Sequence, residues 1–317
     1  MARRRERTAT RPVDWRQAAD PDDLREYDAF GPWVDRVRDE VQMPRLFRPW
    51  YPELRDATFL LKVPRNVDRA AARPGMDLYD AILAVHDLGV TLLKRGDRGV
   101  TRQDASWRDV VGCATYTNLL LARWTLLLAD GSQIELDHNS VASQVIASVT
   151  EEVRRRIVPD TVPAVDPHLP SLTAPQDYFG SALARLTRTF PAPVAAIHLE
   201  PRNRLCRDAR NRRRLSTGVM VVDTPRELVV VSRGTPTRPL FAPDYATNTL
   251  LVPYGRLTSF DVAPATGKPG SFGALVLRAG DQVVSQPCLD KPEAPAAALA
   301  ARGVRRRASA EPVVAGA

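Results

Sequence analysis

The strongest chemical signal in the sequence is a dense run of arginines in EPRNRLCRDARNRRRL, Glu200–Leu215. A guanidinium group is a planar fork of donors that can hold two phosphate or carboxylate oxygens at once. Several such groups in one loop favour an anionic ligand, such as a phosphorylated headgroup or an acidic membrane surface. The predicted anion- and lipid-binding residues are Arg202, Arg204, Arg207, Arg210, Arg212, Arg213 and Arg214.

The histidines, cysteines and glycine-containing loops lack the spacing of a catalytic or metal site. No histidine has other histidine, cysteine or carboxylate residues near it at the spacing that a zinc site requires. The three cysteines are odd in number and far apart, which is typical of the reducing cytoplasm. The loops GDRGVTRQD and ATGKPG do not match a phosphate-binding motif. We predict no metal, no cofactor and no catalytic residue, and an enzyme stays open because catalytic groups can assemble from distant parts of a chain.

The overall charge also favours an anionic partner, because the net charge is +8 and the isoelectric point is about 9.8. Further arginine runs lie in the N-terminal tail, at Arg154–Arg156 and at Arg305–Arg307. The alternative is that such runs are ordinary solvated surface. Nucleic acid ranks third among partners, since aromatic residues make up only 6% of the chain and do not alternate with the basic runs.

A second candidate site is the segment VQMPRLFRPWYPELRD, Val41–Asp56, where large apolar side chains are concentrated among prolines. The prolines prevent a long helix. Tryptophan, tyrosine and arginine are the residues that anchor protein interfaces, so we predict partner docking through Phe47, Trp50 and Tyr51. The alternative is that the segment covers the first domain and fills its core, because large apolar patches rarely stay exposed.

The elements that would position these residues occur twice along the chain. The strand ending KVPRN, Lys62–Asn66, has a counterpart in LEPRN, Leu199–Asn203. Each is followed by two β-rich runs that are separated by a turn and close in Arg-Gly. SWRDVVGCATY then matches PYGRLTSFDVA, and the hairpin WTLLLADGSQIEL matches GALVLRAGDQVVS. Similar features in the same order predict an internal duplication.

Each repeat is predicted to contain a helix, six or seven short antiparallel strands and a closing helix. The first helices are expected at residues 27–40 and 176–189. The closing helix of the first repeat, NSVASQVIASVTEEVRRRI, has Asn139 or Ser140 as its cap. Its buried face is predicted to carry Val141, Val145, Ile146 and Val149. Alternation along the strands predicts core positions at Leu83, Val85, Leu126, Leu128, Val219, Val221, Leu275 and Leu277.

Strands in series closed by one C-terminal helix resemble the pleckstrin-homology (PH) superfold, particularly the bacterial PH-like domains. GVMVVDTPRELVVVSRG is similar to their strand–turn–strand pattern, and LLVPYGRLTSFDV is similar to their recurrent IPYxRIxSVxV strand. The first repeat shares the order of elements but has ASWRDVVGCATY in the corresponding place. The resemblance covers residues 55–157 and 190–303 and implies bent sheets whose open ends are plugged by helices. A β-barrel pair of another family is the alternative.

The resemblance also implies binding. In lipid-binding PH domains the loop that corresponds to Glu200–Leu215 carries the basic residues that hold phosphorylated headgroups. Bacterial PH-like domains, in contrast, often serve as modules for protein interaction or oligomerisation. The resemblance therefore implies a binding role without identifying the ligand.

We thus predict an α+β chain with two tandem PH-like bent-sheet or barrel domains, each closed by a C-terminal helix. The expected organisation is a disordered basic tail (1–25), a first repeat (26–157), a proline-rich linker (158–175), a second repeat (176–307) and a disordered tail (308–317). No stretch approaches the about 18 apolar residues of a membrane-spanning helix, and the N-terminus lacks the apolar segment of a secretory signal.

The predicted function is that of a non-catalytic binding or scaffold protein of the cytoplasm. It would dock to protein partners and, at the inner membrane face, to anionic lipid through the second repeat. The alternative function is an enzyme whose site lies in a cleft between the two domains.

Overall fold

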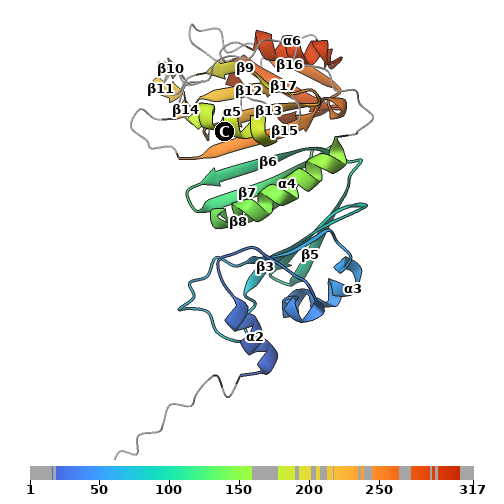
Figure 1. Ribbon diagram of the computed structural model, residues 1–317, viewed down its shortest axis with the longest axis vertical. Coiled ribbons are helices and arrows are strands. Elements are labelled where there is room, and N and C mark those ends of the chain that lie inside the picture. Colours follow the sequence, from blue (N-terminus) through green and yellow to red (C-terminus); the bar gives the residue numbers. More distant parts are fainter. Residues whose placement is uncertain are drawn as a thin grey trace, which may run out of the picture.

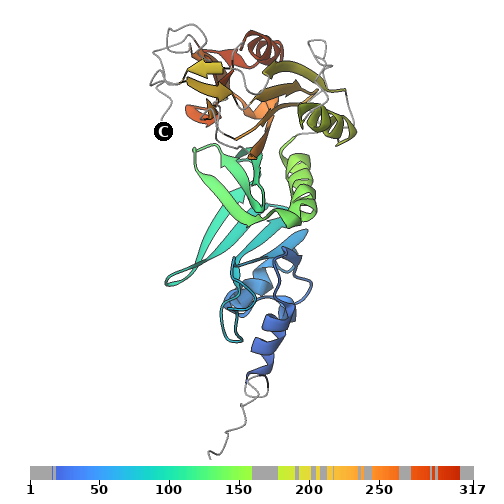
Figure 2. The ribbon, with the colours of Figure 1, turned by 90° about the vertical axis from the view of Figure 1, so that its left-hand side faces the viewer.

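The computed structural model shows an elongated α+β chain of mostly antiparallel sheets, with helix α2 near one end and helix α6 at the other (Figures 1 and 2). It describes residue 16 and the ranges 19–158, 178–189, 193–200, 205–207, 213–216, 218–234, 237–238, 245–263, 273–285, 288–289 and 292–307. Most of the predicted tails and linker, at 1–15, 159–175 and 308–317, lies outside the described residues.

Helix α2 (Pro21–Ala29) lies near the position of the first predicted helix but begins earlier, within the segment that we assigned to the tail. Asp20 caps it by accepting a hydrogen bond from the backbone N–H of Asp22 at 2.8 Å. Gly31 and Pro32 follow its end and do not favour a continued helix. The predicted helix over 27–40 is therefore wrong. The chain instead forms strand β1 (Asp35–Arg36) and the 3₁₀ helix η1 (Glu40–Gln42), followed by η2 (Arg45–Trp50) and α3 (Tyr51–Leu54).

The first half continues as two antiparallel meanders, as the alternating sequence pattern predicts. The first meander is β2 (Phe59–Pro64), β3 (Tyr79–His86), β4 (Gly89–Gly96) and β5 (Gly99–Ser106), which form a five-stranded sheet with β1. The second meander is β6 (Val110–Asn118), β7 (Leu121–Leu128) and β8 (Gln133–Asn139). The short η3 (Ser140–Ala142) and helix α4 (Ser143–Ile157) close this half.

The second half begins with helix α5 (Tyr178–Thr189), where the sequence predicts one, and then has the same order of main strands. The first series is β9 (Ala195–Glu200), β12 (Val219–Asp223), β13 (Glu227–Ser232) and β15 (Thr247–Pro253). The second is β16 (Ser259–Ala263), β17 (Gly273–Ala279) and β18 (Gln282–Ser285), and α6 (Glu293–Ala301) follows. The additional short elements are β10 (Leu205–Arg207), β11 (Arg213–Ser216), β14 (Thr237–Arg238), η4 (Tyr254–Arg256), β19 (Cys288–Leu289) and β20 (Arg305–Arg306).

The two halves share one sheet and do not form separate barrels. Strand β6 pairs antiparallel with β15, so a seven-stranded sheet runs in the order β8-β7-β6-β15-β13-β12-β9. Gly112 permits this close approach, because a Cβ atom there would lie 2.7 Å from the carbonyl oxygen of Leu251. We predicted domains in the form of bent sheets or barrels, and the barrel form is wrong, because the sheets of the described residues do not close. An edge strand of the first half gains its partner in the second half.

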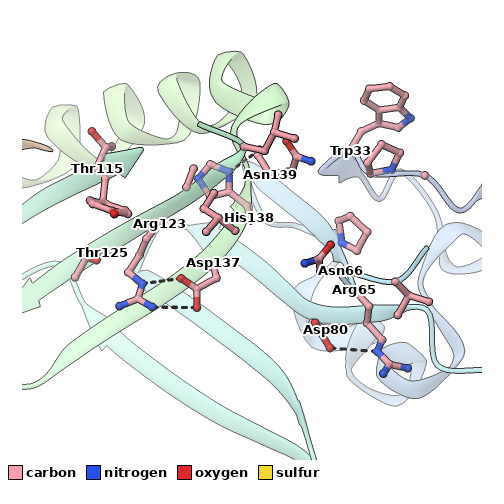
Figure 3. A pocket seen from close by; sticks show the side chains of 18 of the residues that line it. Trp33, Arg65, Asn66, Asp80, Thr115, Arg123, Thr125, Asp137, His138 and Asn139 are labelled. Atoms are coloured by element: carbon pink, nitrogen blue, oxygen red, sulfur yellow. Dashed lines mark hydrogen bonds and ion pairs between the residues drawn. The ribbon is translucent and has the colours of Figure 1, made fainter. Parts of the chain in front are cut away.

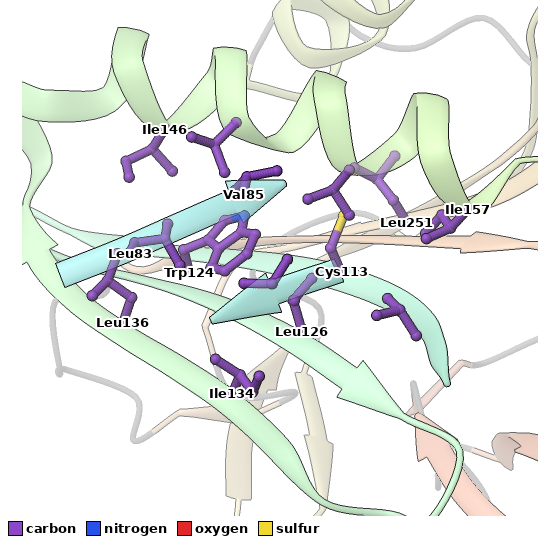
Figure 4. Close-up of a cluster of buried hydrophobic side chains, with 14 of the residues drawn as sticks. Leu83, Val85, Cys113, Trp124, Leu126, Ile134, Leu136, Ile146, Ile157 and Leu251 are labelled. Carbon is purple, nitrogen blue, oxygen red and sulfur yellow. The ribbon is translucent and has the colours of Figure 1, made fainter. Parts of the chain in front are cut away.

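The central core crosses this junction (Figure 4). It includes side chains of the first-half sheets and α4, such as Trp124, and continues to Met220 of β12 and Phe179 of α5. The Nε1 atom of the buried Trp124 donates to Thr150 Oγ1 at 3.2 Å, which fixes α4 on the strands. A second cluster lies between the second-half sheets and α6, and a third lies between the η1–α3 segment and the first sheet.

Most predicted core positions are confirmed. Those on β3, β7, β12 and β17 are buried, except that Leu128 is only partly buried. On the closing helix, Ile146 and Val149 are buried, whereas Val141 lies before α4 and is 50% exposed. Asn139 does act as a cap, but of η3, where its side chain accepts from the N–H of Val141 at 3.1 Å.

Two arginines hold the halves together beside the shared sheet. Arg154 of α4 makes a buried ion pair with Glu227 of β13, with 2.9 Å between Nη2 and Oε2. Arg256 of η4 donates to the carbonyl oxygens of Trp107, Arg108 and Ile157, at 3.1, 2.9 and 3.3 Å. Polar groups as well as apolar packing therefore connect the two halves.

Candidate binding cleft

The predicted anion-binding arginines lie partly in the described chain. Arg207 is in β10, and Arg213 and Arg214 are in β11, which pairs with β10 with Arg207 opposite Arg213. The side chains of these three lie outside the described part, as do the residues Arg202, Arg204, Arg210 and Arg212. The strands thus place part of the cluster on a hairpin-like extension of the second half.

The predicted docking residues pack against the protein. Phe47 is completely buried in the cluster that covers the first sheet, and Trp50 and Tyr51 are partly buried against the same cluster. Phe47 therefore offers no surface to a partner, and the alternative that the segment covers the sheet and fills the core applies to it. The prolines shape this cover, because the chain turns through η2 and α3 in place of a long helix.

A different site is prominent in the structure. A cleft of about 1480 Å³ opens between the β6–β8 meander and the loops that follow α2 and β2 (Figure 3). Its strand wall includes Thr115, Thr125 and Asp137, and its loop wall includes Trp33 and Asn66. Among the described residues that line it, only Asn248 comes from the second half. The described lining therefore belongs mainly to the first half of the chain.

The strand wall carries a paired charge. Arg123 holds Asp137 with two hydrogen bonds, from Nε to Oδ1 at 2.6 Å and from Nη2 to Oδ2 at 3.2 Å. It also approaches Glu135 at 3.4 Å. These residues lie on the same face because Arg123 and Asp137 are directly opposite in the β7–β8 ladder. The charges compensate each other before any ligand arrives.

The loop wall is held by arginines that bind backbone carbonyls. Arg65 donates to the carbonyl of Asp77 at 2.9 Å and lies 3.7 Å from the carboxylate of Asp80. Arg69 donates to the carbonyls of Tyr27 and Phe30, and its guanidinium lies over the Tyr27 ring. The Arg65 contacts hold the two ends of the loop between β2 and β3 together, and the Arg69 contacts tie this loop to the end of α2.

His138, the one histidine among the described lining residues, is not arranged as a catalytic base with Asp137. His138 and Asp137 are adjacent on β8, so their side chains point to opposite faces. The His138 Nδ1 atom lies 3.0 Å from the carbonyl of Asn139. Burial lowers the pKa of His138, which keeps the imidazole neutral at neutral pH. In the described ranges, no three His, Cys, Asp or Glu side chains gather in a way that could hold a metal ion.

Apolar side chains form the mouth of the cleft. Trp33 is 54% exposed, and Leu120 and Leu121 are each 64% exposed. The sequence prediction missed these residues. Trp33 was assigned to a helix, and the run NLLLA, Asn118–Ala122, was not considered. The sequence did contain a signal for this mouth. Three leucines lie together at the boundary between two strands, where polar turn residues are usual.

Comparison with protein-family models and with curated proteins gives no relative for this chain. No protein-family model matches it, and the search of curated proteins found no match. Within the described part of the chain, no helix has both the length and the apolar character needed to cross a membrane.

Proposed function

We propose that the protein is a non-catalytic docking protein of the cytoplasm, built from two tandem PH-like repeats. In this proposal the cleft of the first repeat holds an extended segment of a protein partner. The cleft itself is the observation that supports it most directly, because it combines an exposed apolar mouth with an edge strand, β8, in its wall. An extended segment can pair with such an edge through its backbone and place side chains on the apolar groups.

The charge arrangement supports binding over chemistry. Arg123 and Asp137 bind each other, and Arg65 and Arg69 bind protein carbonyls. Groups that are already paired provide a fixed polar surface, which suits recognition of a peptide backbone. The junction of the halves is filled by the shared sheet and the central core, so it supports a rigid scaffold more than an interdomain catalytic site.

A tandem origin is supported by the matching order of strand pairing in the halves. It is also supported by an equivalent contact. Arg156 of α4 binds Asp87 in the β3–β4 turn at 2.7 Å, and Arg302 after α6 binds Asp223 at the end of β12 at 3.1 Å. In each half an arginine near the end of the closing helix reaches a carboxylate at the same hairpin.

The test is a selection of random phage-displayed peptides on the full chain, followed by calorimetric titration of the selected peptides. Trp33→Ala should weaken their binding by about 30-fold or more, the loss expected for an anchoring tryptophan. Leu88→Ala is the matched control, because Leu88 is 80% exposed in the β3–β4 turn and does not line the cleft.

A second pair of variants separates the cleft from general surface effects. Thr125→Arg places a long charged side chain in the cleft and should abolish peptide binding, whereas Thr101→Arg on the exposed strand β5 should not. Equal enrichment of peptides on the wild-type chain and on Thr125→Arg would contradict the proposal.

A further inference from the structure

The tip of the β6–β7 hairpin consists of exposed leucines. Asn118 and Leu121 form the last pair of the ladder, so Leu119 and Leu120 make a two-residue loop. The exposed fractions of Leu119, Leu120 and Leu121 are 66%, 64% and 64%. Large apolar side chains at a protruding loop gain little from packing within the chain.

The backbone of this loop is also unfavourable for leucine. Leu119 has φ 54°, and it is the one non-glycine residue with positive φ in the described ranges. Two-residue hairpin loops usually place Asn, Asp or Gly at such positions, because a bulky side chain is strained there. Leu119 therefore combines strain with exposure to water. A contact outside the chain would explain why a leucine occupies this position.

Other exposed apolar side chains lie at the same end of the sheet. Val141 is 50% exposed and is adjacent, since Ser140 N–H donates to the carbonyl of Leu120 at 2.9 Å. Tyr245 is 58% exposed and lies two residues before Thr247, which pairs with Thr117 near the end of β6, so it lies at the same end of the sheet. We call this group the apolar edge: Trp33, Leu119, Leu120, Leu121, Val141 and Tyr245.

Strands β10 and β11 carry Arg207, Arg213 and Arg214, and we call them the arginine strands. They leave from the same end of the seven-stranded sheet. One row of paired residues crosses it from Glu200 of β9, through Val219, Ser232, Asn248, Tyr116 and Arg123, to Asp137 of β8. Beyond this row β6 runs into the leucine tip, and the β9–β12 connection runs into β10 and β11, which carry Arg207, Arg213 and Arg214. Figure 1 shows β10, β11 and β14 on the side toward which β6 points. Four strand spacings separate β6 from β9, or about 19 Å.

We propose that this end of the sheet docks onto an anionic lipid bilayer. The leucine tip enters the boundary between headgroups and acyl chains, Trp33 and Tyr245 lie at headgroup level, and the arginine strands attract the charged surface. Tryptophan and tyrosine favour this interface, and each basic residue near an anionic leaflet adds to the attraction. A protruding two-residue loop can bury itself in a fluid bilayer without a complementary pocket, whereas a protein partner would have to provide one.

This inference goes beyond the proposed function and does not depend on it, because it needs no ligand in the cleft. It does predict where the cleft lies relative to the membrane. Trp33, Leu120 and Leu121 belong to both the apolar edge and the cleft mouth, so a chain bound in this way would present the mouth near the membrane surface.

The test is sedimentation of the full chain with vesicles of phosphatidylglycerol and phosphatidylcholine in equal parts, at low salt. The double variant Leu119→Ser/Leu120→Ser should lower the partition coefficient by at least about tenfold. Leu88→Ser is the matched control, since it removes an exposed leucine from another hairpin turn, and it should bind as the wild type does. Arg213→Ala/Arg214→Ala and high salt should each weaken binding.

Several outcomes overturn the proposal. If the wild-type chain does not sediment with these vesicles, the apolar edge serves a protein partner. If the leucine double variant sediments like the wild type, the tip does not enter the bilayer. Thermal unfolding followed by circular dichroism checks that all variants are folded, and the leucine variants should be, because Leu88, Leu119 and Leu120 are exposed. Peptide binding in the cleft is unaffected by either failure, so the two proposals can be told apart.

Discussion

Replacement of Arg154 by methionine should destabilise the chain by about 3–5 kcal/mol, because it leaves a buried carboxylate without its partner. The side chains of Arg154 and Glu227 are 10% and 2% exposed, and the guanidinium donates to both carboxylate oxygens. The pair connects α4 of the first half to β13 of the second. The loss should therefore appear in the unfolding of the whole chain, measured by urea titration of tryptophan fluorescence.

The pH dependence of this variant has a definite sign. Burial raises the pKa of Glu227 above its usual 4.5, and Arg154 counteracts that rise. Without Arg154 the pKa rises further, so the folded state binds a proton more tightly than the unfolded state does. The loss of stability is then fully present above the raised pKa of Glu227 in the folded state. It disappears as the pH falls toward the pKa of Glu227 in the unfolded chain. The difference in stability between wild type and variant should shrink in acid.

Two control variants test whether the buried Arg154–Glu227 pair causes this loss of stability. Arg155→Met removes a neighbouring arginine whose side chain is 63% exposed and bound to Glu152, and it should cost less than about 1 kcal/mol. The double variant Arg154→Met/Glu227→Leu removes both charges and should recover most of the loss. A cost for Arg154→Met no larger than that for Arg155→Met, or one independent of pH, would refute the role of this pair.

Three further predictions concern single positions. Leu119→Asn should raise the free energy of unfolding by about 1 kcal/mol, because asparagine tolerates positive φ. It should also lower vesicle binding, because an apolar side chain is removed from the tip. A loss of stability in chemical denaturation would contradict the first expectation. Phe47→Ala should lower the free energy of unfolding by about 3–5 kcal/mol by opening a cavity, and a surface-like effect below about 0.5 kcal/mol would show that Phe47 is not in the core. Burial raises the pKa of the Cys113 thiol to about 12, so iodoacetamide should modify Cys113 only after unfolding, as mass spectrometry of the digested chain would detect.

Local features of the fold could be predicted from the sequence because they depend on local patterns. Alternation placed Leu83 and Val85 in the core, and the turn at His86–Gly89 separates β3 from β4 as expected. Helix α5 also forms where its periodicity predicts it. The helix predicted over residues 27–40 failed because Gly31 and Pro32 outweigh the apolar spacing.

The long-range features could not be predicted in the same way. The pairing of β6 with β15 joins residues such as Cys113 and Leu251, and nothing in either local pattern specifies that partner. The cleft also depends on long-range geometry, since the loops after α2 and β2 meet the β6–β8 meander. Phe47 illustrates the opposite problem. An apolar residue among prolines looks the same in sequence whether it anchors a partner or fills the core.

The measurement that tests the docking role most directly is hydrogen–deuterium exchange of the full chain with and without a cleft-selected peptide. If the peptide pairs with the edge strand in the cleft wall, the backbone amides of β8, residues 133–139, should become protected. The amides of β5, which is the end strand of the five-stranded sheet, should not change. Protection of β5 with no change in β8 would contradict the proposed docking site.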